Sequence, residues 1–134
     1  MLCSEVAKFL SDNGLGRVGD DIGWSRSSDA LIPQTTLYEM QGGTVGRTQN
    51  DPGVAREMPR LQVIAKAPSY DDARQRAEAA YQVLATVKNQ TLSGVFYLSI
   101  VPQSPPYDLG RDANDQAMLA FSCTVDKRPS PATP

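Results

Sequence analysis

Histidine is missing from this chain of 134 residues, cysteine occurs only twice, and aromatic residues make up 7% of the sequence. Without an imidazole, the chain cannot build a Ser-His-Asp triad or a zinc site that depends on histidine. Cys3 and Cys123 lie far apart in the sequence and form no Cys-x-x-Cys pair. We expect both thiols to be free, in a reducing compartment.

Long hydrophobic runs and an excess of positive charge are also missing. The longest mainly apolar run, residues 95–101, is far short of the roughly 20 residues that a membrane-spanning helix needs, and no signal-like segment opens the chain. The net charge is -2, and no basic patch spans an element. Because tight duplex binding needs several phosphates neutralised at once, we expect neither a membrane contact nor a firm grip on DNA.

The composition is that of a single globular domain, with 40% hydrophobic and 21% charged residues. We assign residues 1–126 to this domain. Residues 127–134 contain three prolines and no apolar pattern, so we expect a disordered tail there.

Residues 69–88 form the clearest predicted element, an amphipathic helix. Its start is marked by Ser69 with Asp72 three residues later, a weak capping box. Apolar residues follow at steps of three and four, which places them on one face of the helix: Ala73, Ala77, Ala80, Tyr81, Leu84 and Val87. Such a helix needs a partner surface, which neighbouring strands must provide.

Alternating β-formers predict four strands, at residues 35–41, 60–67, 94–101 and 117–125, and residues 1–13 show the spacing of a short first helix. Gly42-Gly43 should end the first strand, and residues 42–59 should form a long loop between an antiparallel pair. The strands before and after the central helix should run parallel. We therefore expect an α+β fold: a mixed four-stranded sheet, in the order α-β-β-α-β-β, covered on one face by helices.

Two segments have no apolar period. The glycines between residues 14 and 23 argue for irregular chain, since no lysine follows them as a phosphate-binding loop would require, and Trp24 should anchor this segment to the core or an interface. In the 42–59 loop, Arg47 and Arg56 could meet an acidic surface or passing phosphate, or could be solvated loop charges.

The only candidate for catalysis is the acidic cluster at residues 107–115. Asp108 and Asp112 could act as an acid and base pair. Asp and Asn also bond the backbone of turns, however, and Gly110 supplies the dihedral angles that turns need. The spacing fits no calcium loop. We therefore predict no catalytic, cofactor or metal site, and keep a small carboxylate-dependent enzyme as an alternative.

The order of motifs in residues 59–125 resembles the bacteriophage minor capsid and tail-terminator family. The resemblance is carried by Tyr-Asp-Asp-Ala-Arg at 70–74, opening the helix, followed two strands later by Leu-Gly-Arg-Asp-x-Asn at 109–114. It covers the C-terminal half strongly and the first helix and strand loosely. The regions 13–23 and 42–58 match nothing in the family pattern.

This resemblance implies a subunit of a ring, commonly a hexamer, that caps the completed tail tube and faces the head-tail connector protein. Its partners would be further copies of itself, the tail tube protein and the connector, with DNA only passing through the lumen. The subunit would be assembled in the host cytoplasm and lie at the tail-neck region of the virion. A head completion or neck protein of the same virion is the alternative.

The resemblance also implies that residues 105–114 form a protruding arm that meets a neighbour or the tube. Our hypothesis is that the chain oligomerises through this arm and an adjacent strand. The candidate interface residues are Tyr107, Asp108, Arg111, Asp112, Asn114, Arg47 and Arg56.

Overall fold

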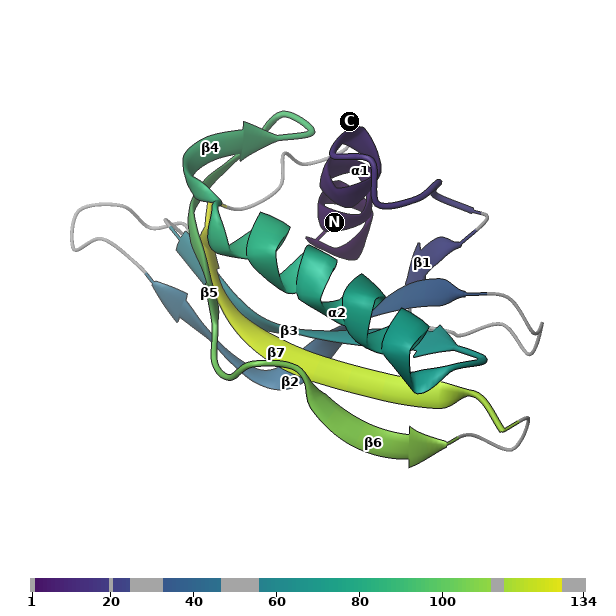
Figure 1. Ribbon diagram of the computed structural model, residues 1–134. Coiled ribbons are helices and arrows are strands. Elements are labelled where there is room, and N and C mark those ends of the chain that lie inside the picture. Colours follow the sequence, from purple (N-terminus) through teal and green to yellow (C-terminus); the bar gives the residue numbers. More distant parts are fainter. Residues whose placement is uncertain (1, 20, 25–32, 47–55, 112–114, 129–134) are drawn as a thin grey trace, which may run out of the picture.

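The computed structural model describes residues 2–19, 21–24, 33–46, 56–111 and 115–128. Along the chain the elements are α1 (Leu2–Asp12), β1 (Ile22–Trp24), β2 (Gln34–Gly46), β3 (Arg56–Ala67), α2 (Tyr70–Ala85), β4 (Lys88–Leu92), β5 (Val95–Pro102), β6 (Tyr107–Arg111) and β7 (Ala117–Lys127). Both helices lie on one face of a curled sheet (Figure 1). The predicted α+β class is confirmed, but the prediction of four strands is wrong, because the described residues form seven.

The sheet has the strand order β1-β2-β3-β7-β5-β4, and β6 pairs with β7 outside this path. β2 and β3 form the predicted antiparallel hairpin, and β1 joins β2 in parallel. β7 is antiparallel to both β3 and β5. β3 and β5 therefore run parallel, as the strand-helix-strand pattern predicts, with β7 between them.

The hairpin of β2 and β3 is longer than the sequence predicts, since β2 continues to Gly46 and β3 begins at Arg56. The ladder shifts register between Met40 and Thr44, opposite a stretch of β3 that contains Pro59. Proline has no backbone N–H to give to a ladder, and glycine accommodates the extra residues of a bulge. Gly42-Gly43 is therefore an irregularity inside the strand, and the prediction that it ends the strand is wrong.

Three strands were not expected, namely β1, β4 and β6. β4 begins at Lys88, which the sequence assigns to the central helix, because α2 ends at Ala85 and not at residue 88. A two-residue turn at Ser93-Gly94 joins β4 to β5. Both turn residues have positive φ, 50° and 82°, as in the hairpin turns that match the twist of a sheet. β1 lies in the glycine-rich segment, where Trp24 packs against the core as predicted.

β5 does not keep the alternation that its sequence suggests. Its register with β7 shifts between Tyr97 and Ser99. The shift exchanges the two faces of the strand, so Ile100 is 2% exposed whereas Val101 is 51% exposed. Val101 therefore leaves the core, although the sequence places it on the same face as Tyr97.

Helix α2 confirms the predicted capping, because the Ser69 hydroxyl accepts a hydrogen bond from the Asp72 N–H at 3.2 Å. Its predicted stripe packs on the sheet, with Tyr81 edge-on against Phe121 at a centroid distance of 5.6 Å. The buried members of the stripe are Ala73, Ala77, Ala80, Leu84 and Val87. The alanines leave room for the backbone of α2 to lie close to β3 and β7.

The C-terminal end of β7 closes the core next to α1. Lys127 is buried and donates to the Glu5 carboxylate at 3.1 Å, and the Tyr97 hydroxyl donates to the same oxygen at 2.6 Å. The ammonium also lies 5.5 Å from the centre of the Tyr97 ring. Lys127 is thus part of the domain, and the assignment of this residue to a disordered tail is wrong. Residues 129–134 lie outside the described part of the chain.

Candidate assembly interface

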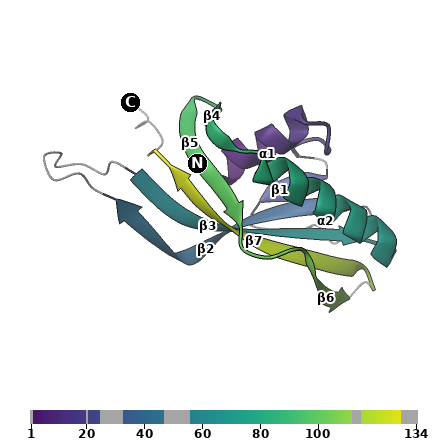
Figure 2. The same cartoon turned by 60° about the vertical axis from the view of Figure 1, so that its left-hand side comes forward.

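β6 lies at an edge of the sheet and is exposed at all five of its residues. One side of the strand pairs with the N-terminal half of β7, and no described strand pairs with its other side. Figure 2 shows β6 projecting below the rest of the sheet. A strand in this position offers both its side chains and its free backbone edge to a partner.

β6 continues the line of β5 along the same edge of β7. β5 pairs with the C-terminal half of β7, the Gln103 N–H donates to the Ser122 carbonyl at 2.7 Å, and β6 then pairs with residues 117–120. Pro105 and Pro106 interrupt the line because they lack the N–H of a ladder. The prediction of a protruding loop at 105–114 is therefore wrong for residues 107–111, which form a strand.

Exposed apolar side chains gather along this edge. Val101 is 51% exposed, Tyr107 is 43% exposed and Leu109 is 41% exposed. Val101 pairs with Thr124 and Tyr107 pairs with Ala120, so both side chains lie on the face of the sheet that no described helix covers. We call Val101, Tyr107 and Leu109 the β6 patch.

The charged residues of the predicted interface have partners within the chain. The Asp108 carboxylate accepts a hydrogen bond from the Gly110 N–H at 2.7 Å, across a bulge where Gly110 has a φ of 89°. The Arg111 guanidinium donates to the Asp115 carbonyl at 2.6 Å and lies 3.8 Å from the Asp115 carboxylate. Arg111 is thus engaged with Asp115, and the apolar side chains of Tyr107 and Leu109 are the exposed groups of β6 without such a partner.

Of the remaining candidates, only the backbone of Arg56 is described. Arg56 is the first residue of β3, where its backbone pairs with Gly46 at the far end of the hairpin. Arg47, Asp112 and Asn114 lie outside the described residues.

A comparison of the chain with models of protein families identifies its family. The model of the family described as "Bacteriophage tail terminator protein" matches residues 9–128. The chain belongs to the bacteriophage tail terminator family. It is therefore a structural protein of a phage virion and not an enzyme, as the resemblance in its sequence indicated.

Solved structures show that the terminator fold recurs at low sequence identity. A chain of the "Virion of native gene transfer agent (GTA) particle" matches with a TM-score of 0.54 and 13% identity, covering 92% of this chain and 84% of the other. A second solved chain matches with a TM-score of 0.51 and 13% identity, covering 98% and 93%. At these identities the likeness concerns the fold alone. A search of curated proteins found no match.

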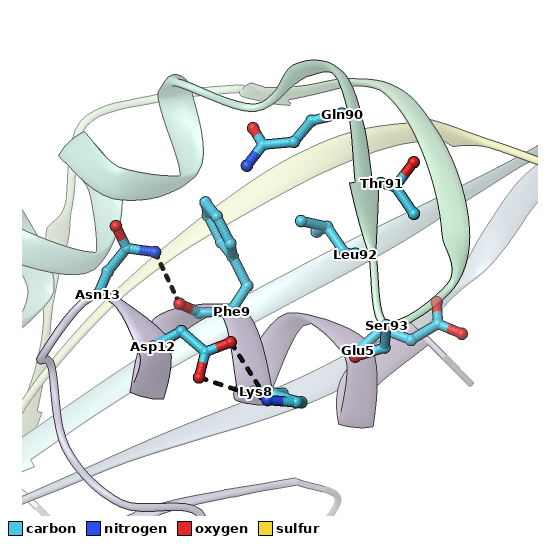
Figure 3. Close-up of a pocket in the computed structure, with 9 residues that line it drawn as sticks. All are labelled: Glu5, Lys8, Phe9, Asp12, Asn13, Gln90, Thr91, Leu92 and Ser93. Carbon is cyan, nitrogen blue, oxygen red and sulfur yellow. Dashed lines mark hydrogen bonds and ion pairs between the residues drawn. The ribbon is translucent and has the colours of Figure 1, made fainter.

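The chain has a pocket of about 330 Å³ between α1 and the β4–β5 hairpin (Figure 3). Phe9 and Leu92 line it together with polar side chains, but its charged groups are already paired. Lys8 and Asp12 form an ion pair at 3.3 Å, and Glu5 is engaged with Lys127. The described residues contain no cluster of three or more side chains suited to a metal ion.

The carboxylate pair considered for catalysis has no support either. Asp108 is exposed and capped onto its own turn, and its proposed partner is outside the described residues. The described helices are all too short or too polar to cross a membrane.

The α1–β1 segment holds a contact that the sequence did not suggest, because its partners are 55 residues apart. Arg76 on α2 donates to the Asp21 carboxylate at 2.8 Å and to the Asp21 carbonyl at 3.0 Å. The same carboxylate accepts from the Arg17 N–H at 2.7 Å. Burial alone would raise the pKa of Asp21, but these hydrogen bonds and the Arg76 charge hold it below its ordinary value.

Gly16 makes this contact possible. A Cβ at position 16 would lie 2.5 Å from the Asp21 carboxylate, which is closer than real Cβ atoms approach. The glycine that looked like a feature of irregular chain therefore lets the carboxylate turn inward toward α2.

Proposed function

We propose that this chain forms a homo-oligomeric ring, sixfold as in the family it resembles, that caps the completed tail tube and joins it to the head connector. The family match carries the terminator assignment. The ring follows from the need to close a tube end with identical subunits. A closed ring of one kind of subunit needs two different surfaces on each copy, one to give and one to receive.

In this proposal the β6 patch is the surface that each subunit inserts into a different surface of its neighbour. Two of its three apolar side chains, those of Tyr107 and Leu109, stand on the edge strand β6. Burial of each exposed side chain against a neighbour stabilises by on the order of 1–2 kcal/mol. The backbone edge contributes less, because Asp108 occupies the Gly110 N–H and the bulge breaks the ladder. We therefore favour side-chain packing over strand addition as the mode of contact.

The charge of the subunit suits a ring through which DNA passes. With a net charge of -2, each copy adds a mildly acidic contribution to the assembly. A basic lumen would hold the phosphates, whereas an acidic or neutral one lets the duplex slide.

Electron microscopy of particles from an infection that lacks this protein tests the proposed function. Tails of uncontrolled length are expected, and supplying the wild-type chain should restore one length. Tails of normal length that fail to join heads would contradict the terminator role and point to head completion instead.

The same complementation experiment tests whether the β6 patch is needed for normal tail length. A Tyr107→Ser, Leu109→Ser double variant should fold but leave tails overlong. A matched control changes Lys88→Ser and Thr91→Ser, two exposed residues of β4, and should restore normal tails. Normal tails with the β6 variant would show that this patch is not needed.

A further inference from the structure

A second pocket lies on the other side of α2 from β6. It has a volume of about 550 Å³ and opens to solvent. Its apolar walls come from Leu15, Pro33 and Ala79, and its polar rim comes from Asp72, Gln75 and Arg76. A mainly apolar hollow with a few polar groups is typical of a binding site.

The turn after α1 fixes one wall of this pocket. The Leu15 N–H donates to the Leu10 carbonyl at 3.1 Å and the Gly14 N–H donates to the Ser11 carbonyl at 3.0 Å. With Gly14 at a φ of 82°, this is a Schellman motif, which ends the helix and turns Leu15 back toward it. The wall is therefore held by backbone hydrogen bonds.

Arg76 brings a charged group to the rim of the pocket. One of its terminal nitrogens donates twice to Asp21, which fixes the guanidinium between β1 and α2. The side chain is 16% exposed, so part of it remains open to the pocket. Its Nε has no partner among the described residues, but it is buried too deeply for an incoming group to reach.

The pocket and the β6 patch lie at opposite edges of the sheet. Pro33 immediately precedes β2, and Arg76 binds the residue before β1, so the pocket belongs to the β1 edge. β6 lies beyond β7 at the other edge. Both views show α2 lying between β1 and β6 (Figures 1 and 2). This is the head-to-tail placement that a ring of identical subunits requires.

We infer that the pocket lined by Leu15, Pro33, Ala79 and Arg76 receives Tyr107 and Leu109 of a second copy of this chain. The inference rests on the proposed ring and names its receiving surface. The apolar walls match the leucine and the tyrosine ring, and the Tyr107 hydroxyl can accept from the exposed part of the Arg76 guanidinium and donate to Asp72 or Gln75. The pocket beside α1 suits these side chains less well, because an ion pair of Lys8 and Asp12 lies in its wall.

Disulfide cross-linking tests the inference directly. Chains carrying Ala79→Cys are mixed with chains carrying Tyr107→Cys or Leu109→Cys, alone and with isolated tail tubes, and oxidised. All three positions are exposed. The native thiols give little background, since both Cys3 and Cys123 are buried. Cross-linked dimers are expected several-fold above a control that carries Lys8→Cys in place of Ala79→Cys.

A single chain with both Ala79→Cys and Leu109→Cys should give a ladder that ends at the closed ring. Native mass spectrometry before oxidation separates the proposed ring from the inferred contact between the pocket and β6 of a second copy. A ring without cross-linking at either β6 position would overturn this inference and leave the proposed function intact. The absence of any ring, alone or on tubes, would overturn both. Cross-linking of position 79 to the tube protein would assign the pocket to a different partner and overturn the inference.

Discussion

At the scale of single residues, the buried charges at the C-terminal end of β7 are the feature of the fold with the largest desolvation cost. Glu5 and Lys127 are both buried, and the Tyr97 hydroxyl completes the group. A buried ion pair is weak support for stability as a pair, because desolvation offsets its attraction, but losing one partner is costly. The group therefore fixes α1 against the sheet in one arrangement.

Lys127→Met should lower the free energy of unfolding by about 3–5 kcal/mol, because it removes the buried ammonium that pairs with the Glu5 carboxylate. Urea denaturation measures this change. The double variant Glu5→Leu, Lys127→Met should recover most of the loss, since neither charge remains. Equal destabilisation by the single and the double variants would show that packing, and not the unpaired charge, explains the effect.

Acid should weaken the same contact. Burial alone would raise the pKa of Glu5, but the hydrogen bonds from Tyr97, the N-terminal amine and Lys127, together with the charge of Lys127, outweigh burial and hold it below its ordinary value of 4.5. A carboxylate whose pKa is lowered by folding contributes stability above its unfolded pKa and loses it as pH falls through the folded one.

Below pH 4.5 the free energy of unfolding should therefore fall more steeply for the wild-type chain than for Glu5→Gln. Asp21, whose pKa is also lowered, contributes in the same direction to both proteins and cancels in the comparison. If the free energy of unfolding fell equally with pH in the two proteins, the assignment of the acid sensitivity to Glu5 would be contradicted.

The thiols are a further residue-scale feature. Burial raises the pKa of Cys3 to about 11, helped by the charge of Glu39, and burial raises the pKa of Cys123 to about 12. Because the thiolate is the reactive form, both should react with a thiol reagent only when the chain unfolds. Fast modification of either cysteine in the folded protein would contradict their burial.

At the scale of elements, the sequence predicts well what depends on local patterns. The α2 stripe, its Ser69 cap and the short first helix follow from spacing of three and four residues and from cap chemistry. The structure confirms all three. These features need no knowledge of distant parts of the chain.

Elements whose residues are mostly exposed were missed. β4 buries only Leu92 and β6 buries none of its residues, so neither shows an apolar period. Ser93-Gly94 was an available signal for the β4–β5 hairpin, since a Ser-Gly pair suits a two-residue turn. For β6, Pro105-Pro106 and Gly110 indicated a loop, and only pairing with β7 makes a strand of it. The Asp21–Arg76 contact had no local signal at all.

Gly14→Ala tests the element that shapes the second pocket. Its φ of 82° costs an alanine roughly 1–2 kcal/mol, so the free energy of unfolding should fall by about that amount. Gly23→Ala is the matched control, because an added Cβ there meets nothing within 4 Å and the backbone has no positive φ. If both variants lost the same free energy of unfolding, the positive φ of Gly14 in the Schellman turn would not be the cause of the loss.

At the scale of the whole molecule, the apolar core and the proposed assembly surfaces lie in different places. The helices and the core face of the sheet enclose the apolar side chains, whereas β6 and the β1 edge remain at the two rims. The sequence indicated the family, and its choice of residues 105–114 as a contact surface stays a prediction. It could not indicate the pocket proposed as the second surface, because residues from the turn after α1, from α2 and from the start of β2 line it together.

The mass of the purified protein, measured by native mass spectrometry with and without isolated tail tubes, tests the central claim most directly. The account predicts a closed oligomer for the wild-type chain and monomers for the Tyr107→Ser, Leu109→Ser variant under the same conditions. A wild-type chain that stays monomeric at every concentration and leaves the tube ends bare would contradict it.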